Sequence, residues 1–150
     1  MHIETTHCPS EADEAFVIAQ TRAFNAAFTT NDVQPLCSFA RSSDGRIVGG
    51  LTAKTYWNYL ELSFLWVEAS HRRTGLGRSL VLAAEAEAIR RGCHYALVDT
   101  FSFQARPFYE RLGYRQFGEI GGFERGHVRH YMTKQLDGTG MRRPPGAPTP

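Results

Sequence analysis

The sequence predicts an α/β fold of the α+β kind, in which a central mixed sheet of six to seven strands is flanked by helices. Alternating apolar and polar residues recur between turn signals, as at 36–41 and 47–56. The segment 65–80 begins as an apolar strand, passes two glycines and continues as a helix. A nearly continuous apolar run at 95–101 then follows, as in a central strand. Strand, helix and strand in this succession indicate a right-handed parallel crossover.

The first elements expected are a short strand at 3–7 and a helix that ends near Phe28. Ser10 can cap this helix, and Asp13 stands three residues on, as in a capping box. Its apolar residues recur at helical spacing, which predicts one apolar stripe: Phe16, Ala19, Ala23 and Ala27.

Two strands joined by a tight turn come next, at 36–41 and 47–56. The dipeptide Asp-Gly at 44–45 is a strong hairpin signal. The glycine pair at 49–50 indicates a bulge or a close approach of another element.

The strand expected at 59–68 carries an acid in an otherwise largely apolar run. Strict alternation divides it into two faces. One face would hold Leu60, Leu62, Phe64 and Trp66, and the other Tyr59, Glu61, Ser63, Leu65 and Val67.

The second half of the chain predicts two helices and three strands. A helix at 76–91 stops at Gly92, and a shorter one lies within 102–114, where Pro107 fits only the first turn. Strands follow the first helix at 95–101 and the second at 115–120 and 127–135.

Composition excludes several classes of protein. A formal net charge of +2 argues against a nucleic-acid module held by a basic face, and no stretch is long and apolar enough to span a bilayer. Three scattered cysteines indicate neither a disulfide framework nor a metal site, and the N-terminus lacks the shape of a signal peptide. A cytoplasmic protein without a metal is therefore expected.

The C-terminal segment differs in composition from the rest of the chain. Four of the seven prolines lie in residues 137–150, together with several glycines. We therefore expect one domain over 1–136 and a disordered tail over 137–150.

The junction between strand and helix at 67–79 has the pattern of an anion site. Arg72-x-x-Gly75-x-Gly77 places free backbone N–H groups and the positive end of a helix dipole at one point. A Walker loop would need a lysine after Gly77, and a dinucleotide fingerprint a third glycine where Leu80 stands.

This loop resembles motif A of the GNAT family, the GCN5-related N-acetyltransferases, in which loop amides hold the pyrophosphate of acetyl-CoA. The segment 102–114 resembles motif B, with Ala105, Phe108, Tyr109, Gly113 and Tyr114 in register and Ser102 where asparagine is usual. The resemblance implies a parallel strand pair that splays to hold acetyl-CoA. It implies these acetyl-CoA contacts: Trp66, Val67, Arg72, Arg73, Thr74, Gly75, Leu76, Gly77, Arg78, Ser79 and Ser102.

The resemblance also implies the chemistry. Tyr109 matches the family's acid for the departing thiolate, and an amide near Val67 would polarise the thioester carbonyl. Glu61 stands where the histone-acetylating members carry a catalytic glutamate, so it is the first candidate for the base. His127 and His130 are alternatives, since histidine titrates near neutral pH.

The expected activity is transfer of an acetyl group from acetyl-CoA to a primary amine of a small molecule, by direct transfer in a ternary complex. Trp57, Tyr59 and His130 are candidates for contact with that acceptor. A protein N-terminal or lysine acetyltransferase is the second reading, and a non-catalytic CoA-binding module is the third. Homodimers are common in the family, so a homodimer is also expected.

Overall fold

The structure, a computed structural model, describes residues 1–136 and forms two compact units. One unit comprises Met1–Asp32, and the other begins at Val33. The tail expected at 137–150 lies outside the described residues. A single domain over 1–136 stays a prediction.

The first unit is built on α1 (Glu11–Asn25), whose start is the expected capping box. The Ser10 hydroxyl accepts a hydrogen bond from the Asp13 N–H at 3.1 Å and donates one to the Asp13 carboxylate at 2.7 Å. The expected strand at 3–7 is wrong, because this segment has no strand partner. Its only apolar residue is Ile3, so a sheet would gain little by taking it up.

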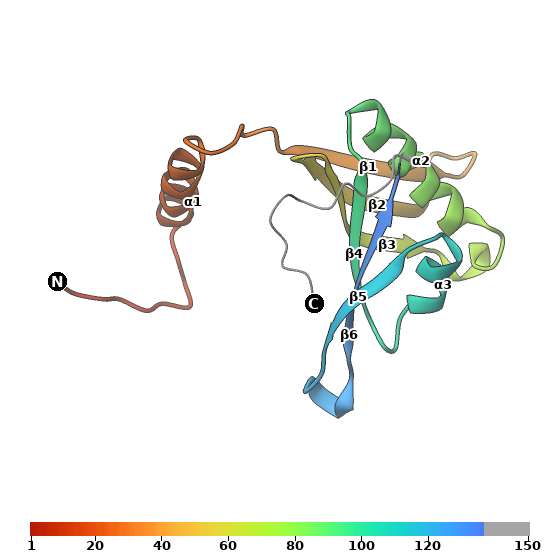
Figure 1. Ribbon diagram of the computed structural model, residues 1–150. Helices are drawn as coiled ribbons and strands as arrows, with labels where there is room; N and C mark the ends of the chain where they lie inside the picture. Colours follow the sequence, from red (N-terminus) through yellow and green to blue (C-terminus); the bar gives the residue numbers. More distant parts are fainter. Residues whose placement is uncertain (137–150) are drawn as a thin grey trace, which may run out of the picture. The chain divides into compact units, whose positions relative to one another are not determined.

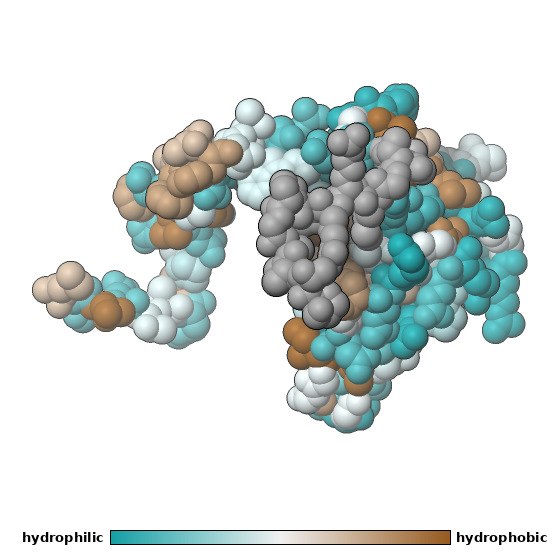
Figure 2. Space-filling view, in the orientation of Figure 1, coloured by the Kyte–Doolittle hydropathy of each residue, from teal (hydrophilic) through white to brown (hydrophobic). Residues whose placement is uncertain are grey.

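The second unit contains a six-stranded mixed sheet, which confirms the predicted fold class (Figure 1). The order is β1-β2-β3-β4-β6-β5, and only the β3–β4 pair is parallel. The strands are β1 (Gln34–Arg41), β2 (Ile47–Tyr56), β3 (Tyr59–Val67), β4 (Tyr95–Phe101), β5 (Arg115–Ile120) and β6 (Arg129–Gln135). Figure 2 shows a mostly hydrophilic surface, with apolar surface beside the loop between β5 and β6, where Ile120 and Phe123 are exposed.

Two helices complete this unit, α2 (Leu76–Arg90) and α3 (Arg106–Arg111). Helix α2 connects β3 to β4 and packs across β1, β2 and β3. Its fully buried residues include Val81, Ala84 and Ala88, which lie in one core with Leu51 and Leu60 of the sheet. The predicted helix at 76–91 is therefore confirmed to within one residue.

A bulge in β3 corrects the predicted faces of this strand. Thr52 of β2 pairs with Phe64 but Ala53 pairs with Leu62, so Ser63 is the extra residue. One extra residue exchanges the faces of every side chain beyond it. Leu65 and Val67 therefore join Leu60 and Leu62 on the α2 side, whereas Phe64 and Trp66 lie on the face of Tyr59 and Glu61.

The parallel strands β3 and β4 pair only along their first residues. The register pairs are Tyr59 with Tyr95, Leu60 with Ala96 and Glu61 with Leu97. Beyond Glu61, the end of β3 remains paired with β2 alone. The splayed pair implied by the sequence resemblance is thus present, and it opens toward the glycine-rich loop.

Gly49 allows α2 to approach the sheet. A Cβ atom there would lie 3.2 Å from a Leu76 methyl carbon and 3.3 Å from one of Leu80. We expect Gly49→Ala to lower the free energy of unfolding by about 1–3 kcal/mol, because the methyl overpacks the core. Denaturant unfolding should show no loss for the control Gly118→Ala, whose Cβ meets nothing within 4 Å. Equal effects of the two substitutions would contradict close packing at Gly49.

Candidate active site

A cavity of about 960 Å³ brings the two predicted motifs together. The end of β3, the following loop, the start of α2 and the segment around α3 all contribute to its wall. The lining residues are Leu65, Trp66, Val67, His71, Arg72, Arg73, Gly75, Gly77, Arg78, Phe103, Gln104, Ala105, Phe108 and Arg111. Seven of the eleven predicted acetyl-CoA contacts are among them.

The loop at the base of this cavity presents free amides. Gly75 precedes α2 with φ +91°, a conformation that suits glycine, and the non-glycine Arg73 also has a positive φ of 64°. The Ser79 N–H donates to the Gly75 carbonyl at 3.0 Å. The N–H groups of Leu76 and Gly77 precede this first hydrogen bond of the helix, so they have no acceptor within it. They lie at the positive end of the helix dipole. An anion in the cavity would meet donors without displacing any hydrogen bond of the helix.

The cavity wall is strongly cationic. Arg72, Arg73 and Arg78 come from the loop and the first turn of α2, and Arg111 comes from α3. None of the described residues that line this cavity is acidic. Such a wall favours a ligand with several negative charges, and arginine offers paired donors to phosphate.

Arg72 also ties the loop to the strand that precedes it. Its Nε donates to the Val67 carbonyl oxygen at 3.0 Å. On the other edge of β3, the Glu68 N–H donates to the Val48 carbonyl at 2.9 Å. Because backbone groups alternate along a strand, the amide groups of Val67 and Leu65 face the splay rather than β2.

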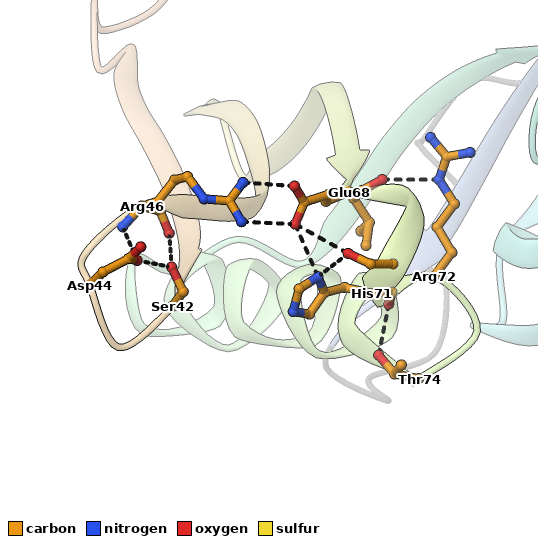
Figure 3. Close-up of polar contacts among 9 residues, drawn as sticks. Ser42, Asp44, Arg46, Glu68, His71, Arg72 and Thr74 are labelled. Carbon is orange, nitrogen blue, oxygen red and sulfur yellow. Dashed lines mark hydrogen bonds and ion pairs between the residues drawn. The ribbon is translucent and has the colours of Figure 1, made fainter.

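Glu68 braces the loop against the β1–β2 hairpin (Figure 3). Its carboxylate accepts a hydrogen bond from Arg46 Nη1 at 2.7 Å and lies 3.2 Å from Nδ1 of His71. The hydrogen bond from Arg46 lowers the pKa of Glu68. Thr74 closes the loop from the other side, donating to the His71 carbonyl at 2.8 Å. These contacts link the turn to the hairpin and to its own backbone.

Four predicted acetyl-CoA contacts do not line the cavity: Thr74, Leu76, Ser79 and Ser102. Leu76 packs against the core, and the Ser79 amide closes the first helical turn. Ser102 joins β4 to the start of β6, because its hydroxyl accepts from the Val128 N–H at 3.2 Å and its N–H donates to the Val128 carbonyl at 2.8 Å. Their predicted role at the cofactor stays a prediction.

A second cavity of about 220 Å³ lies where β3 and β4 have separated. Residues 62–65 of β3 and 98–100 of β4 line it, with Gln104, Ala105 and Tyr109. Leu65, Gln104 and Ala105 line both cavities, so the two adjoin. Tyr109 thus lines a small cavity next to the larger, cationic one.

Tyr109 is 6% exposed and packs edge-on against Phe108 and Tyr114. Burial, followed by the negative charge of Asp99, raises the pKa of Tyr109 to about 12. The hydroxyl therefore keeps its proton throughout the physiological range and can act as a donor. This placement is consistent with the predicted role of an acid.

Glu61 lies at the last register pair before the strands separate, and it lines neither cavity. The Tyr56 hydroxyl donates to its Oε2 at 2.6 Å, and Lys54 Nζ lies 3.3 Å from its Oε1. Burial and this contact with Glu61 raise the pKa of Tyr56 to about 12. Both carboxylate oxygens of the predicted base thus already have partners.

The residues predicted for the acceptor also lie outside both cavities. Trp57 is in the turn between β2 and β3, and Tyr59 stacks on Tyr95 with ring centroids 5.2 Å apart. Tyr59 and Val67 are the two ends of β3, about 26 Å apart at roughly 3.3 Å per residue. Tyr59 therefore lies at the end of the strand opposite to the one that lines the larger cavity. His130 is buried beside Glu119, and His127 stacks edge-on against Phe103, which lines the larger cavity.

Several lining residues were not predicted as site residues. Gln104 lines both cavities, and its side-chain oxygen accepts from the Phe101 N–H at 2.9 Å, which fixes the turn after β4. Asp99 lines the smaller cavity, and Arg111 lines the larger one. Asp99 gave a signal in the sequence, because it is a charged residue in an otherwise apolar central strand.

Comparison with known proteins gives a consistent result. A blasticidin-S acetyltransferase from Streptomyces morookaense is 38% identical over 100 residues, or 66% of this chain and 74% of that protein. An acetyltransferase from Agrobacterium fabrum is 32% identical over 115 residues, or 76% of this chain and 84% of that protein. The crystal structure of an acetyltransferase from Bacillus cereus ATCC 14579 superposes with a TM-score of 0.81 at 31% identity, covering 91% of this chain and 98% of that one.

Within residues 1–136, no group of three or more potential metal ligands lies together, and no helix is long and apolar enough to cross a membrane.

The family model for the acetyltransferase (GNAT) family matches residues 4–114. Motif order, splayed strands and relatives agree with that match. The chain is an acetyltransferase and belongs to the GNAT family.

Proposed function

We propose that this protein transfers the acetyl group of acetyl-CoA to a primary amine of a small molecule, by direct attack within a ternary complex. The observation that carries this proposal is that the cationic cavity at the loop adjoins the cavity lined by Tyr109. The first suits a multiply charged anion, and the second is a small chamber that holds a protonated hydroxyl. The relative named for acetylation of blasticidin S supports a small-molecule acceptor.

The larger cavity fits the phosphate-bearing part of acetyl-CoA. Amides at the start of α2 would bind the pyrophosphate, while Arg72, Arg73, Arg78 and Arg111 supply charge around it. The pantetheine arm would then run along the free edge of β3, where the Leu65 and Val67 amide groups face the splay. An extended chain that pairs with a free strand edge gains hydrogen bonds and a fixed direction.

The reaction then takes place beside the smaller cavity. The amine nitrogen attacks the thioester carbon, and an amide of the free β3 edge stabilises the charge that develops on the carbonyl oxygen. The C–N bond forms and the C–S bond breaks. The ammonium form of the amine first gives one proton to water, and the neutral amine attacks. As the amide forms, the nitrogen loses a second proton and keeps one hydrogen. The thiolate sulfur receives one proton from Tyr109, which regains a proton from the nitrogen or from water.

The raised pKa of Tyr109 defines how it can assist. A thiol has a reference pKa of about 8.5, whereas that of Tyr109 is about 12. The tyrosine therefore remains protonated until negative charge has developed on sulfur. It acts first as a strong hydrogen-bond donor to that charge, and proton transfer completes as the nitrogen gives up its own proton.

A panel of acceptors tests this function. Wild-type protein with acetyl-CoA should release thiol and form an acetylated product, detected by mass, with blasticidin S or another small primary amine. Initial rates measured at varied concentrations of both substrates should give intersecting lines, since both must be bound together. Acetylation of peptides alone would assign a protein substrate instead, and parallel lines would contradict direct transfer.

A further inference from the structure

Among the described residues that line the smaller cavity, Asp99 is the one with a charged side chain. Had the parallel pairing of β3 and β4 continued past Glu61 and Leu97, Asp99 would face Ser63. The strands have separated there, and both residues border the gap instead. Tyr109 lines the same cavity from α3.

The Asp99 carboxylate is held in place from one side. Arg129 Nε donates to its Oδ2 at 2.7 Å. The Arg129 guanidinium in turn lies over the rings of Phe101 and Tyr131, with its Cζ 5.6 Å and 5.5 Å from their centroids. Because both residues come from neighbouring strands, the carboxylate has a fixed direction, and its second oxygen can accept hydrogen bonds from a ligand.

Glu61 provides the comparison. It lies on the same face of the sheet, since Glu61 registers with Leu97 and Asp99 follows two residues along β4. Its two oxygens already accept from Tyr56 and pair with Lys54, and it borders neither cavity. Of the two carboxylates, Asp99 is therefore the one that shares a chamber with Tyr109.

We propose that Asp99 binds the ammonium form of the acceptor amine, so that the substrate is an amine that is cationic at neutral pH. This inference rests on the proposed function. An ammonium group supplies three donors and one positive charge, which complement a carboxylate in a chamber whose other lining groups are uncharged. The bound nitrogen would lie beside Tyr109 and the free edge of β3, where the thioester is expected.

The test is Asp99→Asn, which keeps the size of the side chain and removes its charge. Steady-state kinetics should be measured with an alkylamine, which is cationic, and with an aromatic amine or hydrazide, which is neutral at the same pH. We expect KM for the cationic acceptor to rise about tenfold or more, as for loss of a charged hydrogen bond. KM for the neutral acceptor and the acetyl-CoA affinity, measured by calorimetry, should change less than about twofold, because neither ligand offers a positive charge to this carboxylate.

Two further variants separate recognition from other roles. Glu61→Gln should lower kcat without raising KM for the cationic amine if Glu61 is the base. Glu110 lies on the surface of α3, so Glu110→Gln should change neither kcat nor KM for the cationic amine. A KM increase in Glu61→Gln with none in Asp99→Asn would overturn the proposal. An equal rise of KM for the cationic and the neutral acceptor in Asp99→Asn would overturn it too. A wild type that acetylates no amine would overturn the proposed function itself, together with this inference.

Discussion

Tyr109→Phe is expected to reduce turnover by about 10²–10⁴-fold, the usual contribution of a positioned acid. The substitution removes a hydroxyl whose pKa is held near 12 by burial, and it keeps the ring contacts with Phe108 and Tyr114. Single-turnover measurements at saturating substrates should place the loss in the chemical step. Calorimetry should show acetyl-CoA affinity close to that of the wild type.

The pH dependence gives an independent check on this residue. In the proposed mechanism Tyr109 acts in its protonated form, so its contribution should be lost only as the pH rises through its pKa, near 12. A fall in wild-type turnover well below that pH would have to arise from another group and should persist in Tyr109→Phe. If the substitution changes turnover less than about threefold, water or another donor protonates the thiolate.

Gly77→Val is expected to weaken acetyl-CoA binding by about ten- to a hundredfold for each charge-assisted hydrogen bond that it displaces. A Cβ at this position would lie 3.6 Å from the Phe108 ring and 3.7 Å from a Val67 methyl, so a methyl fits but the branched side chain projects into the cavity. Calorimetric titration measures the loss, and thermal unfolding without ligand shows whether the fold is kept.

Two glycine variants serve as controls for that experiment. Gly77→Ala adds only the atom that the structure accommodates, and it should bind with intermediate affinity. Gly118→Val lies on β5, where a Cβ meets nothing within 4 Å, and should leave binding unchanged. Gly75 is a poorer site for the test, because its φ of +91° would strain any side chain. Unaltered affinity in Gly77→Val would contradict the placement of the pyrophosphate at this loop.

Much of the sheet could be predicted because its determinants are local. The strands at 47–56, 95–101 and 115–120 occur at the predicted residues, since alternation and turn signals mark them in the sequence. The glycine-rich loop was equally clear, because its spacing specifies both the turn and the helix start.

The faces of β3 could not be predicted, because the bulge depends on tertiary packing. Ser63 carries no glycine or proline signal, and its extra position is visible only in the register with β2. The same limit applies to the chamber around Tyr109. Asp99 lies in a run that reads as a core strand, and only the separation of β4 from β3 exposes its carboxylate to a cavity.

The short register between β3 and β4 has a consequence for the lifetime of the protein. Three residue pairs join the half of the sheet made of β1, β2 and β3 to the half made of β4, β6 and β5. A cofactor that fills the gap would bridge both halves and bind only the folded chain. At a hundred times its dissociation constant, such a ligand adds about 2.7 kcal/mol to the free energy of unfolding. Resistance to proteolysis would then follow the supply of acetyl-CoA, so the enzyme would persist longest when its own substrate is abundant.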